Sequence, residues 1–336
     1  MDKAAVLGAG SWGTAFAQVL VDAGTETVLW ARREELAEAI CRQHENVDYL
    51  PGVRLPPMLR ATTDPGEALA NADVVVLAVP SQTLRDNLTK VADLIAPNAV
   101  LVSLMKGVEL GTDKRMSEVI REVLDVPEER VAVVSGPNLA KEIAAREPAA
   151  AVVACTDLDV AGRVQASCHA GYFRPYRNHD VVGCEFGGAV KNVIALAVGM
   201  AAGLGFGDNA RASLITRGLA ETARIGVAMG AEPMTFAGLA GMGDLVATCT
   251  SPLSRNRTFG EFLGRGMTVD EVVAKVNQTT EGVKSSQSIF DIAERHGVAA
   301  PITEHVVKVV TDGMTVPEMM VSLLSRDPKH EHDADV

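Results

Sequence analysis

Lys191 lies in an unusual setting for a charged residue, the small and apolar run from Gly187 to Ile194. A lysine in such a helix must either reach water with its side chain or face a cavity that holds a partner. Burial disfavours the ammonium form and lowers the pKa of a lysine, which suits the side chain to proton transfer. The glycines beside it let another segment or a ligand approach closely. We therefore interpret Lys191 as a proton donor or acceptor.

Two polar segments further along the sequence each have two explanations. Asp244 ends the turn that starts at Gly241, and it is either the N-cap of a helix or the acidic partner that orients Lys191. The run Ser254–Arg257 is either a solvated loop or a basic, hydrogen-bonding cluster. An acidic protein needs such a local cluster to hold an anionic substrate, because its overall charge repels anions.

Two more polar groups follow predicted strands in the first half of the sequence. Lys106 comes just after the apolar run Val100–Leu104, and Ser135–Asn138 closes the run that starts at Val131. Ligands of open α/β sheets bind at the carboxyl ends of the strands, so both groups are candidates for a site. The alternative is plain turn chemistry, since glycine, proline and asparagine are common in turns.

Near the start of the sequence, Gly8, Gly10 and Gly13 have the G-x-G-x-x-G spacing of a dinucleotide-binding loop. The first glycine permits a tight turn, the second lets a diphosphate approach the backbone, and the third packs the helix against the strand. The helix that begins there offers free N–H groups to the phosphates. Because the motif follows a strand and opens a helix, we predict binding of NAD or NADP rather than a structural turn.

The end of the second predicted strand distinguishes between these two cofactors. NAD-selective sites usually place an acidic residue there for the ribose hydroxyls, whereas this sequence has Ala31, Arg32 and Arg33. Two guanidinium groups suit a 2′-phosphate, which they can bind through bidentate hydrogen bonds. We therefore predict a preference for NADPH/NADP, with NADH/NAD as a second usable cofactor.

The surrounding pattern predicts the elements that position these residues. Short apolar runs are expected as strands at Ala4–Leu7, Thr27–Trp30, Val74–Val79, Val100–Leu104, Val131–Ser135, Ala149–Ala154 and Tyr172–Tyr176. Alternation of such strands with helices indicates a doubly wound, mostly parallel Rossmann sheet. The alanine-rich runs of the second half are expected as helices at Ala189–Ala202, Ala212–Met229 and Ser286–His296. The fold class is therefore an α/β Rossmann domain followed by an all-α domain.

We place the Rossmann domain at residues 1–180, the all-helical domain at 181–325 and a charged, disordered tail at 326–336. The tail carries His330 and His332, which we interpret as solvated, and no metal site is expected. The apolar run Phe186–Phe206 contains Lys191 and several glycines, which favours a buried helix over a membrane span. A first strand at Lys3 leaves no room for a signal peptide.

The composition excludes several classes of function. The formal net charge is −12, which disfavours binding to nucleic acid and to anionic membranes. The five cysteines form no C-x-x-C pair, so neither a disulfide framework nor a structural zinc site is expected, and a reducing cytoplasm fits best.

Taken together, these motifs resemble the bacterial NAD(P)-dependent glycerol-3-phosphate dehydrogenases from Ala5 to about Pro301. The matching segments are Gly8–Gly13, Ser103–Gly107, Ser135–Ala140, Gly187–Asn192, Gly205–Gly207, Ile215–Glu221, Gly241–Asp244, Ser254–Arg257 and Glu281–Gly282. The resemblance implies reduction of dihydroxyacetone phosphate to sn-glycerol 3-phosphate, the backbone of membrane phospholipids. It also implies that Lys191 is the proton donor or acceptor at the reacting oxygen.

The resemblance further implies two sets of contact residues. Those around the substrate are Lys106, Gly136, Asn138, Lys191, Asp244, Ser254, Arg255 and Asn256. Those around the cofactor are Gly8, Gly10, Ser11, Trp12, Gly13, Arg32, Arg33, Lys106, Ala140, Arg255, Thr279 and Glu281. Asn138 departs from the Ser or Thr that is common in the family, but an amide can still donate a hydrogen bond.

Two alternative functions share part of these sequence features. A reductase of the same architecture that acts on a β-hydroxy acid or on ketopantoate also combines a Rossmann domain with a lysine on a helix, although Gly241–Asp244 and Ser254–Arg257 argue against it. A non-catalytic NADP(H)-sensing module needs the glycine loop but has no use for Lys106, Lys191 and Asp244 together. The apolar helices of the second half also allow a homodimer.

Overall fold

The computed structural model of this chain describes residues 3–276, 280–327 and 330–331. The chain divides into two compact units. The first unit comprises the residues up to Lys106 together with Lys114–Cys184, and the second comprises Gly107–Asp113 together with the residues from Glu185 onward. Each unit is described by itself below.

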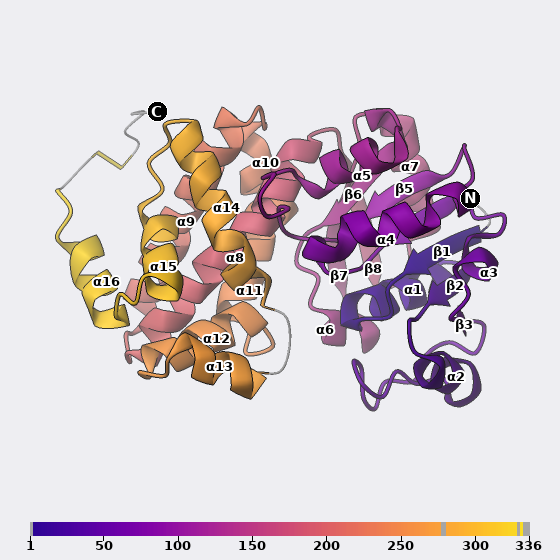
Figure 1. Ribbon diagram of the computed structural model, residues 1–336, viewed down its shortest axis with the longest axis horizontal. Helices are drawn as coiled ribbons and strands as arrows, with labels where there is room; N and C mark the ends of the chain where they lie inside the picture. The colour runs from indigo at the N-terminus through magenta and orange to yellow at the C-terminus, as the bar shows by residue number, and fades with distance from the viewer. Residues whose placement is uncertain (1–2, 277–279, 328–329, 332–336) are drawn as a thin grey trace. The chain divides into compact units, whose positions relative to one another are not determined.

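An eight-stranded sheet in the order β3-β2-β1-β4-β5-β6-β7-β8 forms the centre of the first unit (Figure 1). Its strands are β1 (Lys3–Leu7), β2 (Glu26–Trp30), β3 (Arg60–Thr62), β4 (Val74–Leu77), β5 (Val100–Ser103), β6 (Val131–Ser135), β7 (Ala149–Ala154) and β8 (Phe173–Asn178). The strand order changes direction between β1 and β4, where a doubly wound sheet leaves a crevice for ligands. The predicted Rossmann-type architecture is confirmed.

The sheet is mostly parallel, as predicted, and the structure adds two details. The sheet is parallel from β3 to β6, but β7 pairs antiparallel with β6, with Val134 opposite Val153. A buried strand is apolar whichever way it runs, so its composition carries no sign of its direction. The structure also adds β3, which at three residues is too short to be recognised as an apolar run.

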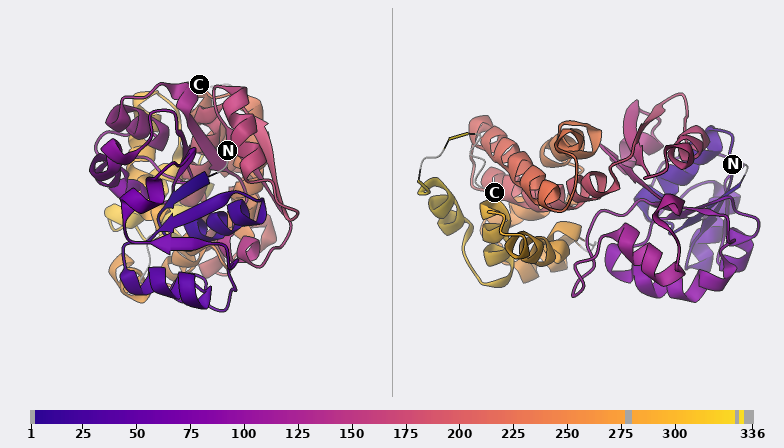
Figure 2. Two further views of the ribbon diagram at one scale, coloured as in Figure 1. Left: turned by 90° about the vertical axis from the view of Figure 1, so that its right-hand side faces the viewer. Right: turned by 90° about the horizontal axis from the view of Figure 1, so that it is seen from above.

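Helices cover both faces of this sheet (Figure 2), and the central strands are buried on both sides. Ala4 and Val6 of β1 belong to one core cluster, whereas Ala5 and Leu7 belong to another. The helices are α1 (Ser11–Asp22), α2 (Glu34–Gln43), α3 (Pro65–Leu69), α4 (Leu84–Val91), α5 (Met116–Leu124), α6 (Ala140–Ala144) and α7 (Leu158–Ser167), with short 3-10 turns η1 (Ser81–Thr83), η2 (Ala92–Leu94) and η3 (Glu128–Arg130).

In the second unit, every regular element among the described residues is helical, as predicted. These are α8 (Val181–Gly203, in this unit from Glu185 onward), α9 (Asp208–Ala228), α10 (Pro233–Ala237), a π-helical turn η4 (Leu239–Gly243), α11 (Asp244–Thr250), α12 (Arg255–Gly264), α13 (Val269–Val276), α14 (Glu281–Arg295), α15 (Pro301–Thr311) and α16 (Val316–Leu324). Helix α8 is long and apolar enough to cross a membrane, but 94% of its most apolar stretch is buried within the fold. It therefore has the character of a core helix.

Helices α8 and α12 cross with their backbones in contact, because each carries two glycines one turn apart. These are Gly199 and Gly203 on α8, and Gly260 and Gly264 on α12. A Cβ atom on Gly260 would lie only 2.1 Å from the carbonyl oxygen of Leu196. Any side chain at this crossing would push the two helices apart, so the glycines determine how α12 lies against α8.

We expect Gly260→Ala to lower the free energy of unfolding by about 1–3 kcal/mol, because the new methyl group overpacks the crossing of α8 and α12. Denaturant titration measures this loss. Gly207→Ala is the matched control: Gly207 has a φ of −77°, and an added Cβ meets nothing within 4 Å. The control should change stability by about 0.5 kcal/mol or less. Equal effects of the two substitutions would contradict a close crossing.

Candidate active site

The glycine loop of the first unit has the geometry that a dinucleotide requires. Gly8 has a φ of +123°, and a Cβ there would lie 2.5 Å from the carbonyl oxygen of Ala78, after β4. A Cβ on Gly13 would lie 2.0 Å from the carbonyl oxygen of Gly8, whereas one on Gly10 meets nothing within 4 Å. Gly8 and Gly13 thus allow the strand and the helix to pack closely. The backbone at Gly10 has no such neighbour among the described residues and is open to a ligand. The amino end of α1, which begins at Ser11, can accept a diphosphate there.

A loop after α2 supports the glycine loop, and sequence analysis did not identify it. The side-chain amide of Asn46 is fully buried and donates to the carbonyl oxygen of Ala9 at 3.0 Å and to Thr14 Oγ1 at 2.8 Å. Ser11 Oγ donates to the carbonyl oxygen of Tyr49 at 3.1 Å. A single asparagine in a polar stretch gives no sequence signal for such a role, because only the fold brings it to Ala9.

The two arginines predicted to bind a 2′-phosphate lie at the end of β2, and both are exposed. Arg33 is the N-cap of α2 and forms an ion pair with Asp48, with 2.6 Å between Nη2 and Oδ2. Trp12, in the first turn of α1, packs its ring against Phe16 at a centroid distance of 5.5 Å. Its side chain therefore contributes to the core beneath the glycine loop.

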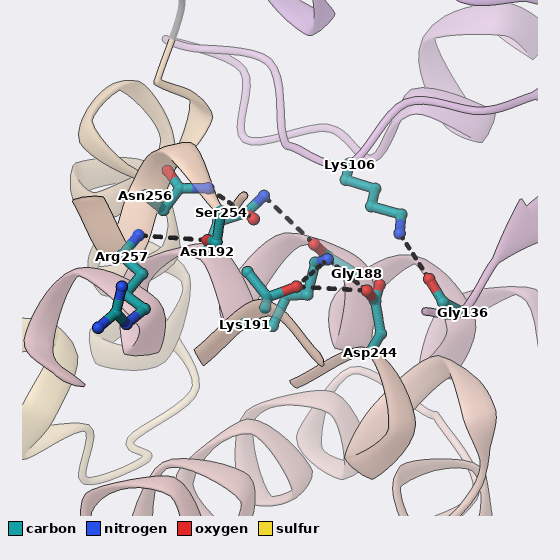
Figure 3. A network of polar contacts seen from close by, with 10 residues as sticks. Lys106, Gly136, Gly188, Lys191, Asn192, Asp244, Ser254, Asn256 and Arg257 are labelled. Carbon is teal, nitrogen blue, oxygen red and sulfur yellow. Dashed lines mark hydrogen bonds and ion pairs between the residues drawn. The ribbon is translucent and has the colours of Figure 1, made fainter. Parts of the chain in front are cut away.

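The carboxyl ends of β5 and β6 bring two predicted site residues together. Lys106 Nζ donates to the carbonyl oxygen of Gly136 at 2.9 Å (Figure 3). Gly136 has a φ of +125°, and a Cβ there would lie 3.2 Å from Ala151 Cα, which explains why a glycine follows β6. Both polar side-chain atoms of Asn138 are buried without a hydrogen-bond partner among the described residues, so its amide suits a polar ligand. Ala140 is the first residue of α6.

In the second unit, Lys191 forms a buried ion pair with Asp244 (Figure 3). Lys191 is 6% exposed and Asp244 is 1% exposed. Lys191 Nζ also donates to Thr248 Oγ1 at 2.7 Å, and that hydroxyl lies 3.4 Å from Asp244 Oδ1. Asp244 is the first residue of α11, and Gly243 is the N-cap. Of the two explanations for Asp244, the structure therefore supports its role as the acidic partner of Lys191.

Glycine contacts bring this ion pair together. A Cβ on Gly187 of α8 would lie 2.4 Å from the carbonyl oxygen of Ala240 in η4, so the two backbones touch there. Lys191 follows Gly187 by four residues, and Asp244 follows Ala240 by four residues, which is about one helical turn in each case. The π-helical turn is an uncommon conformation that often marks functional sites. It places Asp244 at the start of α11, facing the lysine.

Thr248 was not identified by sequence reasoning, although its spacing of four residues from Asp244 on one helix is a usable signal. The next residue, Cys249, is also buried, and burial raises its pKa to about 12. Cys249 therefore remains a neutral thiol at physiological pH and takes no part in proton transfer. Of these neighbouring side chains, Lys191 is the one that carries an exchangeable proton suited to catalysis.

A second polar network joins three helices of this unit. Asn256 Nδ2 donates to Asn192 Oδ1 at 2.9 Å, and Asn256 Oδ1 accepts from the backbone N–H of Gly282 at 2.9 Å. Asn256 is buried, and it links α8, α12 and the start of α14. The side-chain amide of Asn256 thus has a defined orientation. Its partner Asn192 comes directly after Lys191 in the sequence.

The remaining predicted residues of the second unit lie at helix starts. Ser254 is the N-cap of α12, where its Oγ accepts from the backbone N–H of Arg257 at 3.3 Å. Arg255 and Glu281 begin α12 and α14, and desolvation lowers the pKa of Arg255 while the Glu281 carboxylate opposes that shift. Thr279 lies outside the described residues.

Two family models match most of the chain. The model described as the N-terminus of NAD-dependent glycerol-3-phosphate dehydrogenase matches residues 3–161, and the model of the C-terminus matches residues 180–321. The first model covers most of the sheet unit, and the second covers most of the helical unit.

Named relatives agree with this match. Glycerol-3-phosphate dehydrogenase (NAD(P)+) from Streptomyces griseus is 65% identical over 329 residues, which cover 98% of each chain. The structure of glycerol-3-phosphate dehydrogenase from Coxiella burnetii has a TM-score of 0.91 and 35% identity, and the match covers 97% of this chain and 99% of that one. A ketopantoate reductase from Ralstonia eutropha shares the fold at a TM-score of 0.59 and 17% identity, covering 95% of this chain and 100% of that one. The chain therefore belongs to the NAD-dependent glycerol-3-phosphate dehydrogenase family.

Proposed function

We propose that this protein is an NAD(P)-dependent oxidoreductase that reduces dihydroxyacetone phosphate to sn-glycerol 3-phosphate for glycerophospholipid synthesis. The observation that carries the proposal is the buried ammonium group of Lys191, held by Asp244 and Thr248. It occurs in a chain that also has an open dinucleotide loop at Gly10. A proton donor of defined position and a hydride-carrying cofactor are the two components that carbonyl reduction requires.

The chemistry divides between the cofactor and Lys191. When bound, the nicotinamide would supply the hydride for the carbonyl carbon of the substrate. Lys191 donates a proton to the carbonyl oxygen, so that the ketone becomes an alcohol and the lysine becomes a neutral amine. That amine then takes up a proton from water. Asp244 and Thr248 hold the Nζ atom in place for this transfer, because both bond to it.

The phosphate of the substrate needs local positive charge in a protein with a net charge of −12. We assign that role to Arg255 and Asn256, with Ser254 beside them. Family similarity further assigns substrate contacts to Lys106, Gly136 and Asn138. Binding of the phosphate would orient the reacting carbonyl through contacts remote from it.

The cofactor contacts are proposed on the same basis. The glycine loop, with Gly8, Gly10 and Gly13, would hold the diphosphate. The other proposed contacts are Ser11, Trp12, Arg32, Arg33, Lys106, Ala140, Arg255 and Glu281. We propose a preference for NADPH with NADH also accepted, because guanidinium groups bind a 2′-phosphate well.

Two further properties complete the proposal. We infer a cytoplasmic location, which the free state of all five cysteines supports, because cytosolic thiols are kept reduced. We also infer a homodimer through the second unit, which the exposed apolar side chains Met234, Val321 and Leu324 support. The alternative functions, reduction of β-hydroxy acids or ketopantoate and non-catalytic NADP(H) sensing, are disfavoured, because glycerol-3-phosphate dehydrogenase family models match both halves of the chain.

The purified protein should oxidise NADPH when dihydroxyacetone phosphate is added, and NADH more slowly, because the arginines after β2 favour a 2′-phosphate. The initial rate of absorbance loss at a single cofactor concentration measures both reactions. Ketopantoate and acetoacetate serve as carboxylate controls. A faster reaction with either carboxylate would contradict the proposed substrate class.

Lys191→Met should lower kcat by about hundredfold or more, because general acid catalysis typically contributes 10²–10⁴-fold. The affinity for NADPH, followed by its fluorescence, should stay within about twofold. Lys308→Met is the control: it removes a partly exposed lysine of α15 that pairs with Glu304. Turnover near the wild-type rate in Lys191→Met would refute its role as proton donor.

A further inference from the structure

We propose that Asp48 determines how strongly this protein discriminates between NADPH and NADH. The carboxylate holds Arg33 and adds a negative charge where a 2′-phosphate would bind, and it thereby keeps NADH usable. The proposal rests on the dinucleotide use proposed above. It concerns a residue that neither the glycine motif nor the arginine pair contains.

Asp48 lies in a loop that hydrogen bonds anchor on both sides of it. Asn46, two residues before it, is buried and donates to the carbonyl oxygen of Ala9. Tyr49, the next residue, donates its backbone N–H to Asn46 Oδ1 at 3.2 Å and accepts from Ser11 Oγ at 3.1 Å. Asp48 is therefore presented by a loop that bonds directly to the dinucleotide-binding turn.

The ion pair itself is open to competition. The side chains of Arg33 and Asp48 are 54% and 44% exposed, and ion pairs this exposed are weak because water screens them. A 2′-phosphate carries up to two negative charges and can accept bidentate hydrogen bonds from the guanidinium, so it can displace the carboxylate. The displaced Asp48 carboxylate then lies near the phosphate and repels it.

Two neighbouring carboxylates act in the same direction as Asp48, and Arg32 opposes them. Glu34 and Glu35 begin α2 and are exposed directly after it, while Arg32 is exposed directly before it. The local balance is thus two arginines against three carboxylates. NADH carries a 2′-hydroxyl in place of the phosphate, and a hydroxyl can donate a hydrogen bond to a carboxylate. NAD-selective sites place an acidic residue at the end of the second strand, and here the loop provides the carboxylate instead.

The test is the binding of the two half-cofactors 2′,5′-ADP and 5′-AMP, measured by isothermal titration calorimetry on the full-length chain. Asp48→Asn should tighten 2′,5′-ADP about threefold to tenfold and leave 5′-AMP unchanged or weaker. Glu38→Gln is the matched control. It removes the same charge from an arginine pair on α2, with Arg42, and should leave the ratio of the two affinities unchanged.

The same measurement in the Arg33→Ala background separates the two effects of Asp48. If the carboxylate acts mainly by holding Arg33, Asp48→Asn should have a smaller effect on 2′,5′-ADP there than in the wild type. Weaker or unchanged binding of 2′,5′-ADP in Asp48→Asn itself would overturn the inference about Asp48 but not the proposed cofactor use. If the wild-type chain bound neither half-cofactor nor NADPH, the proposed cofactor use would fail, and the inference with it.

Discussion

The second unit depends on one constraint, the contact of α8 with the backbone of η4 at Gly187. Where the two backbones touch, Lys191 and Asp244 lie one turn further along and meet as a buried ion pair. Either charge alone in that position would lower the stability of the fold, because an unpaired buried charge is unfavourable. The helices must therefore pack closely for the lysine to remain in the core, and the same packing gives its Nζ a defined place. The close packing of α8 against η4 therefore both stabilises the buried ion pair and positions the Nζ atom.

The first unit accommodates a dianionic diphosphate in an acidic protein. It offers backbone N–H groups for this rather than charged side chains. Gly8 and Gly13 allow the strand and helix to approach, which leaves the N–H groups at the start of α1 available. Asn46 holds the loop from outside, and the charged residues lie at the margin, where Arg33 meets Asp48. The diphosphate site and the proposed site of discrimination between NADPH and NADH thus lie in separate parts of the unit.

Sequence reasoning found those parts of the site that have local patterns. The glycine spacing, the lysine in an apolar helix and the strand-end groups at Lys106 and Gly136 each follow from residues close together in the chain, and the strand runs gave the sheet. The fold brings Asn46 and Asp48 to their partners, so their residue types alone carry no signal, whereas Thr248 lies one turn after Asp244 on the same helix. The direction of β7 could not be predicted, because an apolar strand has the same composition in either direction.

Asp244 and Thr248 hold the Nζ atom of Lys191 in place for proton donation. Measurement of kcat for dihydroxyacetone phosphate reduction in Asp244→Asn tests this role, with NADPH affinity and circular dichroism measured on the same preparation. We expect a folded protein that binds NADPH and a kcat lower by about hundredfold, because the lysine loses the carboxylate that positions it. A kcat within about twofold of the wild type would show that Asp244 does not position the proton donor.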